Sequence, residues 1–257
     1  MSLRIEDYAM IGNTHTVALV GNNGSIDWLC VPRFDSAACF AALLGNPTNG
    51  HWQIAPNTAV PSVRRRYSGS TLILESEFVS ESGAVVVVDF MPVAKRAQRT
   101  DIVRIVRGLR GAVPMRMDLT VRFDYGRIVP WITRYDRAIR AIAGPDALEL
   151  KTPVPMHVRD FATVSEFTVA SGQSIPFALT WYPSHEAPPS EDDPTELLRE
   201  TEAWWLEWSS RCTLAGPWRD LALRSLITLK ALTYGPTGGI VAAPTASLPE
   251  WIGGPRN

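Results

Sequence analysis

The sequence predicts a mainly β fold, an antiparallel β-sandwich (a supersandwich) that is followed by helices. Within residues 1–183, apolar runs follow one another at short spacing and are separated by turn sequences. Apart from one short segment near the start, no helical pattern lies between these runs, as it would in a parallel α/β sheet. After Tyr182 the composition becomes proline-rich and acidic, and a helical apolar period then begins. We therefore expect a β-domain, a linker and helices, in that order.

Bulk composition excludes several classes of partner. The chain has 257 residues, 46% of them apolar and 20% charged, with a net charge of -1. This charge predicts neither a nucleic-acid partner nor an anionic membrane surface. No apolar run is as long as a membrane-spanning helix, and the N-terminus lacks the pattern of a secretory signal. Cys30, Cys39 and Cys212 have no metal-site spacing, so we expect reduced thiols and a cytoplasmic location.

Short turns are expected to join successive strands into hairpins. Asparagine and glycine tolerate positive φ, which makes Asn-Gly a strong hairpin signal. Between two of these turns, apolar residues alternate and predict one buried strand face, formed by Met115, Met117, Leu119 and Val121. The turns are predicted at Asn22-Asn23-Gly24, Glu81-Ser82-Gly83, Arg110-Gly111, Gly144-Pro145-Asp146 and Ser171-Gly172.

One short helix is predicted near the start of the β-domain. Asp35 has the side chain of an N-cap residue, "SAACFAALL" fills the helix, and Gly45 ends it.

A longer amphipathic helix is predicted after the acidic linker "PSHEAPPSEDDP". Asp193 supplies its N-cap and Pro194 its first position. One face carries Leu197, Leu198, Thr201, Trp204, Trp205 and Trp208. Three indoles are too much apolar area to leave in water, so we expect this face to pack on the sandwich or on the next helix. A stacking surface for sugar rings is the alternative.

A second helix is predicted to begin near Pro217 or Trp218 and to stop at Gly235-Pro236. Its apolar stripe is expected to be Leu221, Leu226, Leu229 and Leu232. Two helices do not make a complete layer, because their outer faces need further helices to cover them. We therefore expect the uncovered helices to self-associate, and we expect that part of the helical domain is missing.

Both ends of the chain carry a family resemblance. "IEDYAMIGNTHTVALVGNNGSIDWLCVPRFDSAACFAALLG" resembles the start of bacterial glycoside hydrolase family 15 proteins, the trehalase and glucoamylase-like group. "GGIVAAPTASLPEWIGGPRN" is similar to the segment that leads, in that family, into an Asn-Trp-Asp-Tyr-Arg run. The resemblance implies a β-sandwich at 1–183, an acidic linker and helix at 184–216, and the first helix of an incomplete (α/α)6 catalytic barrel at 217–257.

The resemblance also implies a function. Family members hydrolyse α-glucosidic bonds with inversion, using two glutamates and no metal or organic cofactor. Those glutamates have no counterparts in the 257 residues, so we assign no catalytic residue and expect the chain to be inactive alone. Trp251, Arg256 and Asn257 are predicted to contact a glucose-containing oligosaccharide or a disaccharide such as trehalose or a maltose-type sugar. Glu250 is interpreted as structural.

Other candidate groups favour structural roles. His15, His51, His157 and His185 lie singly, without zinc-ligand spacing. Arg64-Arg65-Arg66 is interpreted as a solvated face or as a group of charges that protects an edge strand from pairing with another chain. Glu75 and Glu77 are interpreted as surface residues. Two other functions stay open: a non-catalytic β-sandwich module that binds carbohydrate or a partner protein, and complementation by a separate polypeptide that supplies the rest of the barrel.

Overall fold

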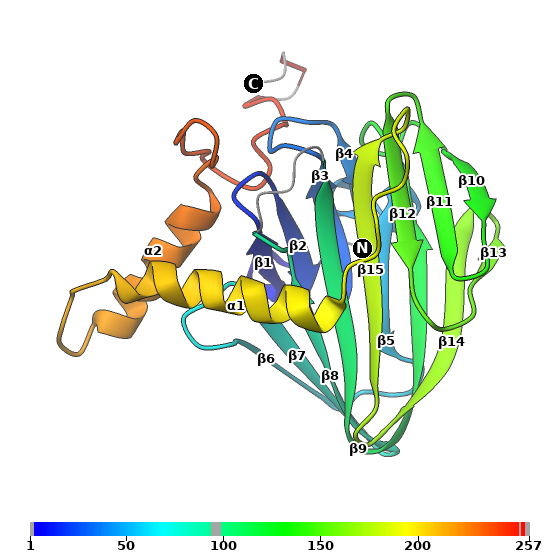
Figure 1. Cartoon of the computed structure of the whole chain (residues 1–257), viewed down its shortest axis with the longest axis horizontal. Helices are drawn as coiled ribbons and strands as arrows, with labels where there is room; N and C mark the ends of the chain where they lie inside the picture. The colour runs from blue at the N-terminus through cyan, green and yellow to red at the C-terminus, as the bar shows by residue number, and fades with distance from the viewer. Residues whose placement is uncertain (1–2, 94–98, 252, 255–257) are drawn as a thin grey trace.

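The computed structural model describes residues 3–93, 99–251 and 253–254, and its main body is two antiparallel sheets that share one long strand (Figure 1). Sheet A has the order β1 (Tyr8–Gly12), β2 (Val17–Gly21), β3 (Ser25–Cys30), β5 (His51–Pro56), β9 (Thr100–Thr120), β14 (Ala162–Ala170) and β13 (His157–Arg159), with β4 (Ala38–Phe40) also paired to β3. Sheet B has the order β6 (Ser62–Tyr67), β7 (Leu74–Ser80), β8 (Gly83–Phe90), β9, β15 (Ser174–Pro183), β12 (Asp146–Lys151), β11 (Ala138–Ala143) and β10 (Trp131–Arg134). The predicted antiparallel β fold is confirmed.

Strand β9 passes from one sheet to the other. Its first half pairs with β8 and β15 in sheet B, and its second half pairs with β5 and β14 in sheet A. The predicted hairpin at Arg110-Gly111 is therefore wrong, because the strand continues through it. Gly111 adopts a φ of +67°, and the register with β8 shifts nearby, so the glycine produces a bend between sheets instead of a reversal.

The other predicted turns are present. Turns join β2 to β3, β7 to β8 and β11 to β12 as hairpins. Ser171-Gly172 also turns the chain, but the strands on its two sides do not pair with each other. They pair instead with opposite halves of β9, so this turn connects the two sheets.

Apolar side chains fill the space between the sheets. The predicted face of Met115, Met117, Leu119 and Val121 is buried, as expected. It belongs to the main core together with Trp52 and Phe177.

The short helix predicted after Asp35 is wrong. Ala38–Phe40 instead forms β4, and a 3-10 turn, η2 (Ala42–Leu44), follows it. Cys39 and Phe40 are buried in the main core, and this burial favours a strand over the local helical preference. Two other 3-10 turns are η1 (Ile5–Asp7) and η3 (Pro47–Asn49).

Helix α1 (Pro194–Ser210) crosses the outer face of sheet B (Figure 1). Its N-cap is Asp193, as predicted, and the side chain accepts a hydrogen bond from the Thr195 N–H. Leu197 packs on the sheet residues Val88 and Val103. Burial of Leu197, Thr201 and Trp205 confirms the predicted inward face.

Helix α2 (Arg219–Ala231) begins and ends close to the predicted residues, but the predicted stripe is wrong. The buried side chains are Leu223, Ile227 and Ala231, which pack with Trp205 of α1. The residues predicted to be inside are instead exposed or half-buried, and they are Leu221, Leu226, Leu229 and Leu232. Apolar residues surround this helix on several sides, so its periodicity does not define one inward face. Among the described residues, neither helix combines the length and the apolar character needed to span a bilayer.

Candidate functional site

The segment after α2 is held against sheet A by side chains from the β-domain. Trp28 Nε1 donates a hydrogen bond of 2.8 Å to the Pro244 carbonyl oxygen. The Tyr125 hydroxyl donates to the Ser247 carbonyl oxygen at 3.2 Å, and Ser247 Oγ lies 3.3 Å from Cys30 Sγ. Ser247 is fully buried. These contacts fix the tail on the β-domain although, in its described part, it forms no helix or strand.

The predicted substrate-binding residues are only partly placed. Trp251 is 66% exposed, and its indole packs against Gly254, where a Cβ would lie 2.7 Å from Trp251 Cε2. Arg256 and Asn257 lie outside the described residues. Glu250 is exposed. Trp251 therefore presents a free aromatic surface beside the docked tail.

Two loops of the β-domain, residues 13–16 and 33–36, meet the start of the tail, residues 234–241, and together they form what we call the loop junction. The Phe34 N–H donates to the His15 carbonyl oxygen at 3.0 Å, and the Gly235 N–H donates to the Thr14 carbonyl oxygen at 2.7 Å. The ring of Tyr234 makes edge contacts with His15 and Phe34. Thr14 has a φ of +68°, an unusual value for threonine. The first of these loops thus joins the other two segments.

A hollow of about 240 Å³ lies at the loop junction. The Arg33 guanidinium pairs with both oxygens of Asp35, at 2.8 and 2.6 Å, and its Cζ lies 5.4 Å from the centre of the Tyr234 ring. The hydrogen bond and negative charge of Asp35 raise the pKa of Arg33, so this guanidinium stays charged. The full lining is Arg33, Phe34, Asp35, Tyr234, Thr237, Gly239, Ile240 and Val241.

The chemistry of this lining suits recognition of a ligand and does not suit hydrolysis. Asp35 is the single carboxylate among its described residues. An inverting glycosidase needs two carboxyl groups, one as general acid and one as general base, roughly 6.5–9.5 Å apart. An aromatic ring beside a fixed polar pair can instead bind a polyhydroxylated ring.

No local pattern in the sequence predicts this hollow. The sequence predicts Asp35 as a helix cap and Gly235-Pro236 as a helix stop. The hollow forms because the segment "PRFD" meets a turn that is distant in sequence. Only a long-range contact brings these two segments together.

His51 and the charged residues of β6 and β7 make structural contacts. His51 Nδ1 lies 3.0 Å from the Pro47 carbonyl oxygen, and the described residues contain no cluster of metal-ligating side chains. Arg65 donates to the Val20 carbonyl oxygen, while Arg66 forms an ion pair with Glu75 at 2.7 Å. Glu77 lies opposite Arg64 in the strand register. Arg64 and Arg66 therefore lie opposite the two glutamates across β6 and β7, and Arg65 lies opposite Ser76.

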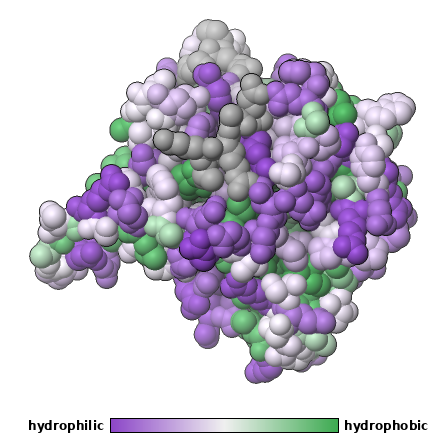
Figure 2. All heavy atoms as spheres, in the orientation of Figure 1, coloured by the Kyte–Doolittle hydropathy of each residue, from purple (hydrophilic) through white to green (hydrophobic). Residues whose placement is uncertain are grey.

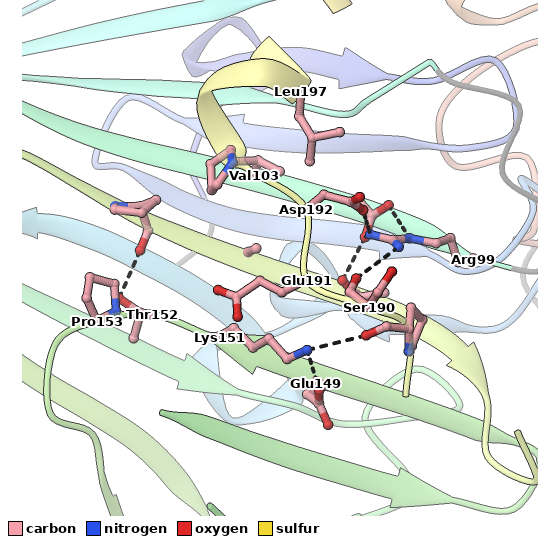
Figure 3. A pocket seen from close by; sticks show the side chains of 16 residues that line it. Arg99, Val103, Glu149, Lys151, Thr152, Pro153, Ser190, Glu191, Asp192 and Leu197 are labelled. Atoms are coloured by element: carbon pink, nitrogen blue, oxygen red, sulfur yellow. Dashed lines mark hydrogen bonds and ion pairs between the residues drawn. The ribbon is translucent and has the colours of Figure 1, made fainter. Parts of the chain in front are cut away.

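A second, narrower cleft lies where the acidic linker crosses sheet B (Figure 3). Arg99 pairs with Asp101 of β9 at 2.7 Å and with Asp192 of the linker at 2.9 Å. Lys151 donates to the Pro189 carbonyl oxygen at 3.4 Å. The cleft has a volume of about 40 Å³, too small for a sugar ring. Its charged groups are used to attach the linker to the sheet.

Comparisons of the sequence with a protein family and with individual proteins both identify trehalase-like relatives. Residues 1–169 match the protein family described as "Trehalase-like, N-terminal". Trehalase of Mycobacterium tuberculosis is 34% identical over 98% of this chain, and trehalase of Thermoplasma volcanium is 32% identical over 99% of it. The chain spans 41% of the length of each of these relatives.

A solved structure, bacterial glucoamylase complexed with acarbose, superimposes with a TM-score of 0.63 over 95% of this chain and 43% of its own. Its sequence identity is 10%, so this likeness shows a shared fold.

Proposed function

The chain belongs to the trehalase-like N-terminal domain family, and from this premise we propose that it is the N-terminal portion of an inverting α-glycosidase of glycoside hydrolase family 15. The observation that carries the proposal is similarity to trehalases over 98–99% of the chain, which includes both helices and the tail. On this basis, residues 1–183 are the β-sandwich domain, 184–216 the linker with α1, and 217–257 the start of the (α/α)6 catalytic barrel.

The proposed substrates of the whole enzyme are trehalose or maltose-type sugars, hydrolysed by two glutamates and without a metal or organic cofactor. The one carboxylate in the described hollow is Asp35 and not a glutamate, so both members of the acid–base pair have to come from elsewhere. We therefore propose that this chain is inactive by itself. Cys30 and Cys39 are buried and form no disulfide, which suits a reducing compartment, and we propose a cytoplasmic location.

The test has two parts. The purified chain is assayed for glucose release from trehalose and from maltose, with no turnover expected. The coding DNA after Asn257 is then read for an Asn-Trp-Asp-Tyr-Arg continuation, and the longer product is expressed and assayed in the same way. The longer product is expected to hydrolyse one of the two sugars. Turnover by the 257-residue chain, or a longer product that hydrolyses neither sugar, would contradict the proposal.

A second candidate function is a carbohydrate-binding module without catalysis. It is favoured by one observation, the presence of a ring-sized hollow that lacks a second carboxylate. Unrelated coding sequence after Asn257, together with sugar binding by the chain, would select this function over the first.

A further inference from the structure

We propose that the hollow at the loop junction is a binding subsite for one glucosyl unit of an α-glucoside, with Arg33 as its main hydrogen-bond donor. The inference deepens the proposed function and rests on it for the choice of sugar. It assigns to the β-domain a direct contact with the ligand, through a loop that lies about two hundred positions before the tail in sequence.

The size of the hollow limits its occupant. Pockets for drug-sized ligands have volumes of roughly 300–1,000 Å³. The hollow has about 240 Å³, which suits a single ring better than an extended oligosaccharide. Tyr234 and Ile240 supply apolar surface, and the Ile240 side chain is 64% exposed there. Such surface matches the C–H faces of a pyranose.

The polar group in the hollow is oriented before any ligand arrives. Asp35 accepts hydrogen bonds from Nε and Nη2 of Arg33, and the guanidinium has further N–H groups that can donate to ligand hydroxyls. Because the pair is bidentate and the guanidinium lies over the Tyr234 ring, little side-chain freedom remains to be lost on binding.

The opposite wall is fixed by its own backbone. The Tyr234 N–H donates to the Gly239 carbonyl oxygen at 2.7 Å, and the Gly238 N–H donates to the Tyr234 carbonyl oxygen at 2.8 Å. Gly238 adopts a φ of +77°, which glycine tolerates without strain. Together with the bond from Gly235 to Thr14, these contacts hold both walls of the hollow on the β1–β2 loop.

The charge of the lining favours a neutral ligand over an anion. The positive charge of Arg33 is matched by Asp35 at 2.6 Å, so the hollow has no net positive charge to attract phosphate. A neutral sugar hydroxyl needs only a directed donor, which the Arg33 guanidinium supplies.

The test is an NMR titration of the ¹⁵N-labelled 257-residue chain with trehalose and with maltose, up to about 50 mM, which detects millimolar affinity. Saturable shifts are expected at the Gly238 and Gly239 amides. Arg33→Ala is expected to weaken binding at least about tenfold, because a hydrogen bond to a charged group is lost. Arg199→Ala is the matched control, since Arg199 forms an exposed bidentate pair with Glu196 on α1.

Two further ligands separate the alternatives. Inorganic phosphate and the open-chain polyol sorbitol are expected to leave both glycine amides unshifted. The inference is overturned if neither sugar shifts them, if Arg33→Ala and Arg199→Ala bind equally well, or if phosphate binds in place of the sugars. The readout is binding by the chain itself, so sugar binding without any hydrolysis by a longer product would reject the proposed function and leave the subsite standing.

Discussion

Arg104 is a charged side chain enclosed between the two sheets, with no exposed surface. Its Nε pairs with Asp89 at 2.8 Å, and its two terminal nitrogens donate to the carbonyl oxygens of Trp52 and Gly24 at 2.7 and 2.8 Å. The guanidinium also lies 5.1 Å from the Trp52 ring centre. Because β8 and β9 lie in sheet B and Trp52 in sheet A, this one side chain connects the sheets.

Removal of the Arg104 charge is expected to leave Asp89 buried without its partner. We predict that Arg104→Met lowers the free energy of unfolding by about 3–5 kcal/mol. Urea denaturation measures this free energy of unfolding. Arg110→Ala, at an exposed position of the same strand, is the control and should change stability by less than about 0.5 kcal/mol. Similar losses in the two variants would show that the buried pair has no special role.

Tyr182 gives a prediction for alkaline pH. Burial, together with the negative charge of Glu149, raises the pKa of Tyr182 to about 12, above the ordinary value of about 10. Between these values the unfolded chain loses the phenolic proton while the folded chain keeps it, so stability falls as pH rises. Tyr182→Phe is expected to lose less stability than the parent chain between pH 8 and pH 11, as measured by urea midpoints. An equal fall in both proteins would count against this assignment.

At the scale of elements, α1 connects the sandwich to α2. Near its start Leu197 packs on sheet B, and near its end Trp205 packs with Leu223 and Ile227 of α2. The neighbouring rings of Trp204 and Trp208 meet Trp205 edge-on, with centroids 4.9 and 6.2 Å away. The three indoles thus pack against one another. Because the Trp205 ring is enclosed in this cluster, it cannot stack on a sugar, which counts against the alternative of a sugar-stacking surface on α1.

Two tryptophans of this region form a matched pair for mutation. Trp205 is fully buried, whereas Trp218, just before α2, is 72% exposed. We predict that Trp205→Ala lowers the free energy of unfolding by about 3–5 kcal/mol through the cavity that it creates. Trp218→Ala should stay within about 0.5 kcal/mol of the parent. Thermal and urea unfolding give both values, and a small effect of Trp205→Ala would mean that the helices are not part of the cooperative unit.

At the scale of the whole molecule, α2 projects away from the sandwich (Figure 1). Its outer face carries Leu221, Leu226 and Leu229, which are 66%, 41% and 50% exposed. Figure 2 shows apolar side chains on this projecting part among polar ones. Exposed apolar patches on a protein surface mark interfaces or aggregation surfaces.

We therefore predict that the chain self-associates as its concentration rises. The double variant Leu221→Glu with Leu229→Glu should remove most of this association, because charges replace the apolar contacts. Sedimentation velocity over a range of concentrations measures this association, with Leu109→Glu, at an exposed position of strand β9, as control. A parent chain that sediments as a monomer at the highest concentration would refute the prediction.

Features that depend on neighbouring residues can be predicted from the amino-acid sequence alone. The N-cap of α1 at Asp193, the hairpin turn at Asn22-Asn23-Gly24 and the buried alternation that includes Met115 and Met117 each follow from interactions within a few positions. Local hydrogen bonding and the two-residue period of a strand fix them wherever the segment lies in the fold.

Which distant segments meet depends instead on tertiary packing. The continuation of β9 through Gly111, the inward face of α2 and the hollow between Arg33 and Tyr234 all depend on partners far away in the chain. A glycine can form either a bend within a strand or a turn between strands. When a helix has apolar residues on several sides, its packing partners decide which side is buried. These choices follow from the burial of one surface against another, which no local pattern encodes.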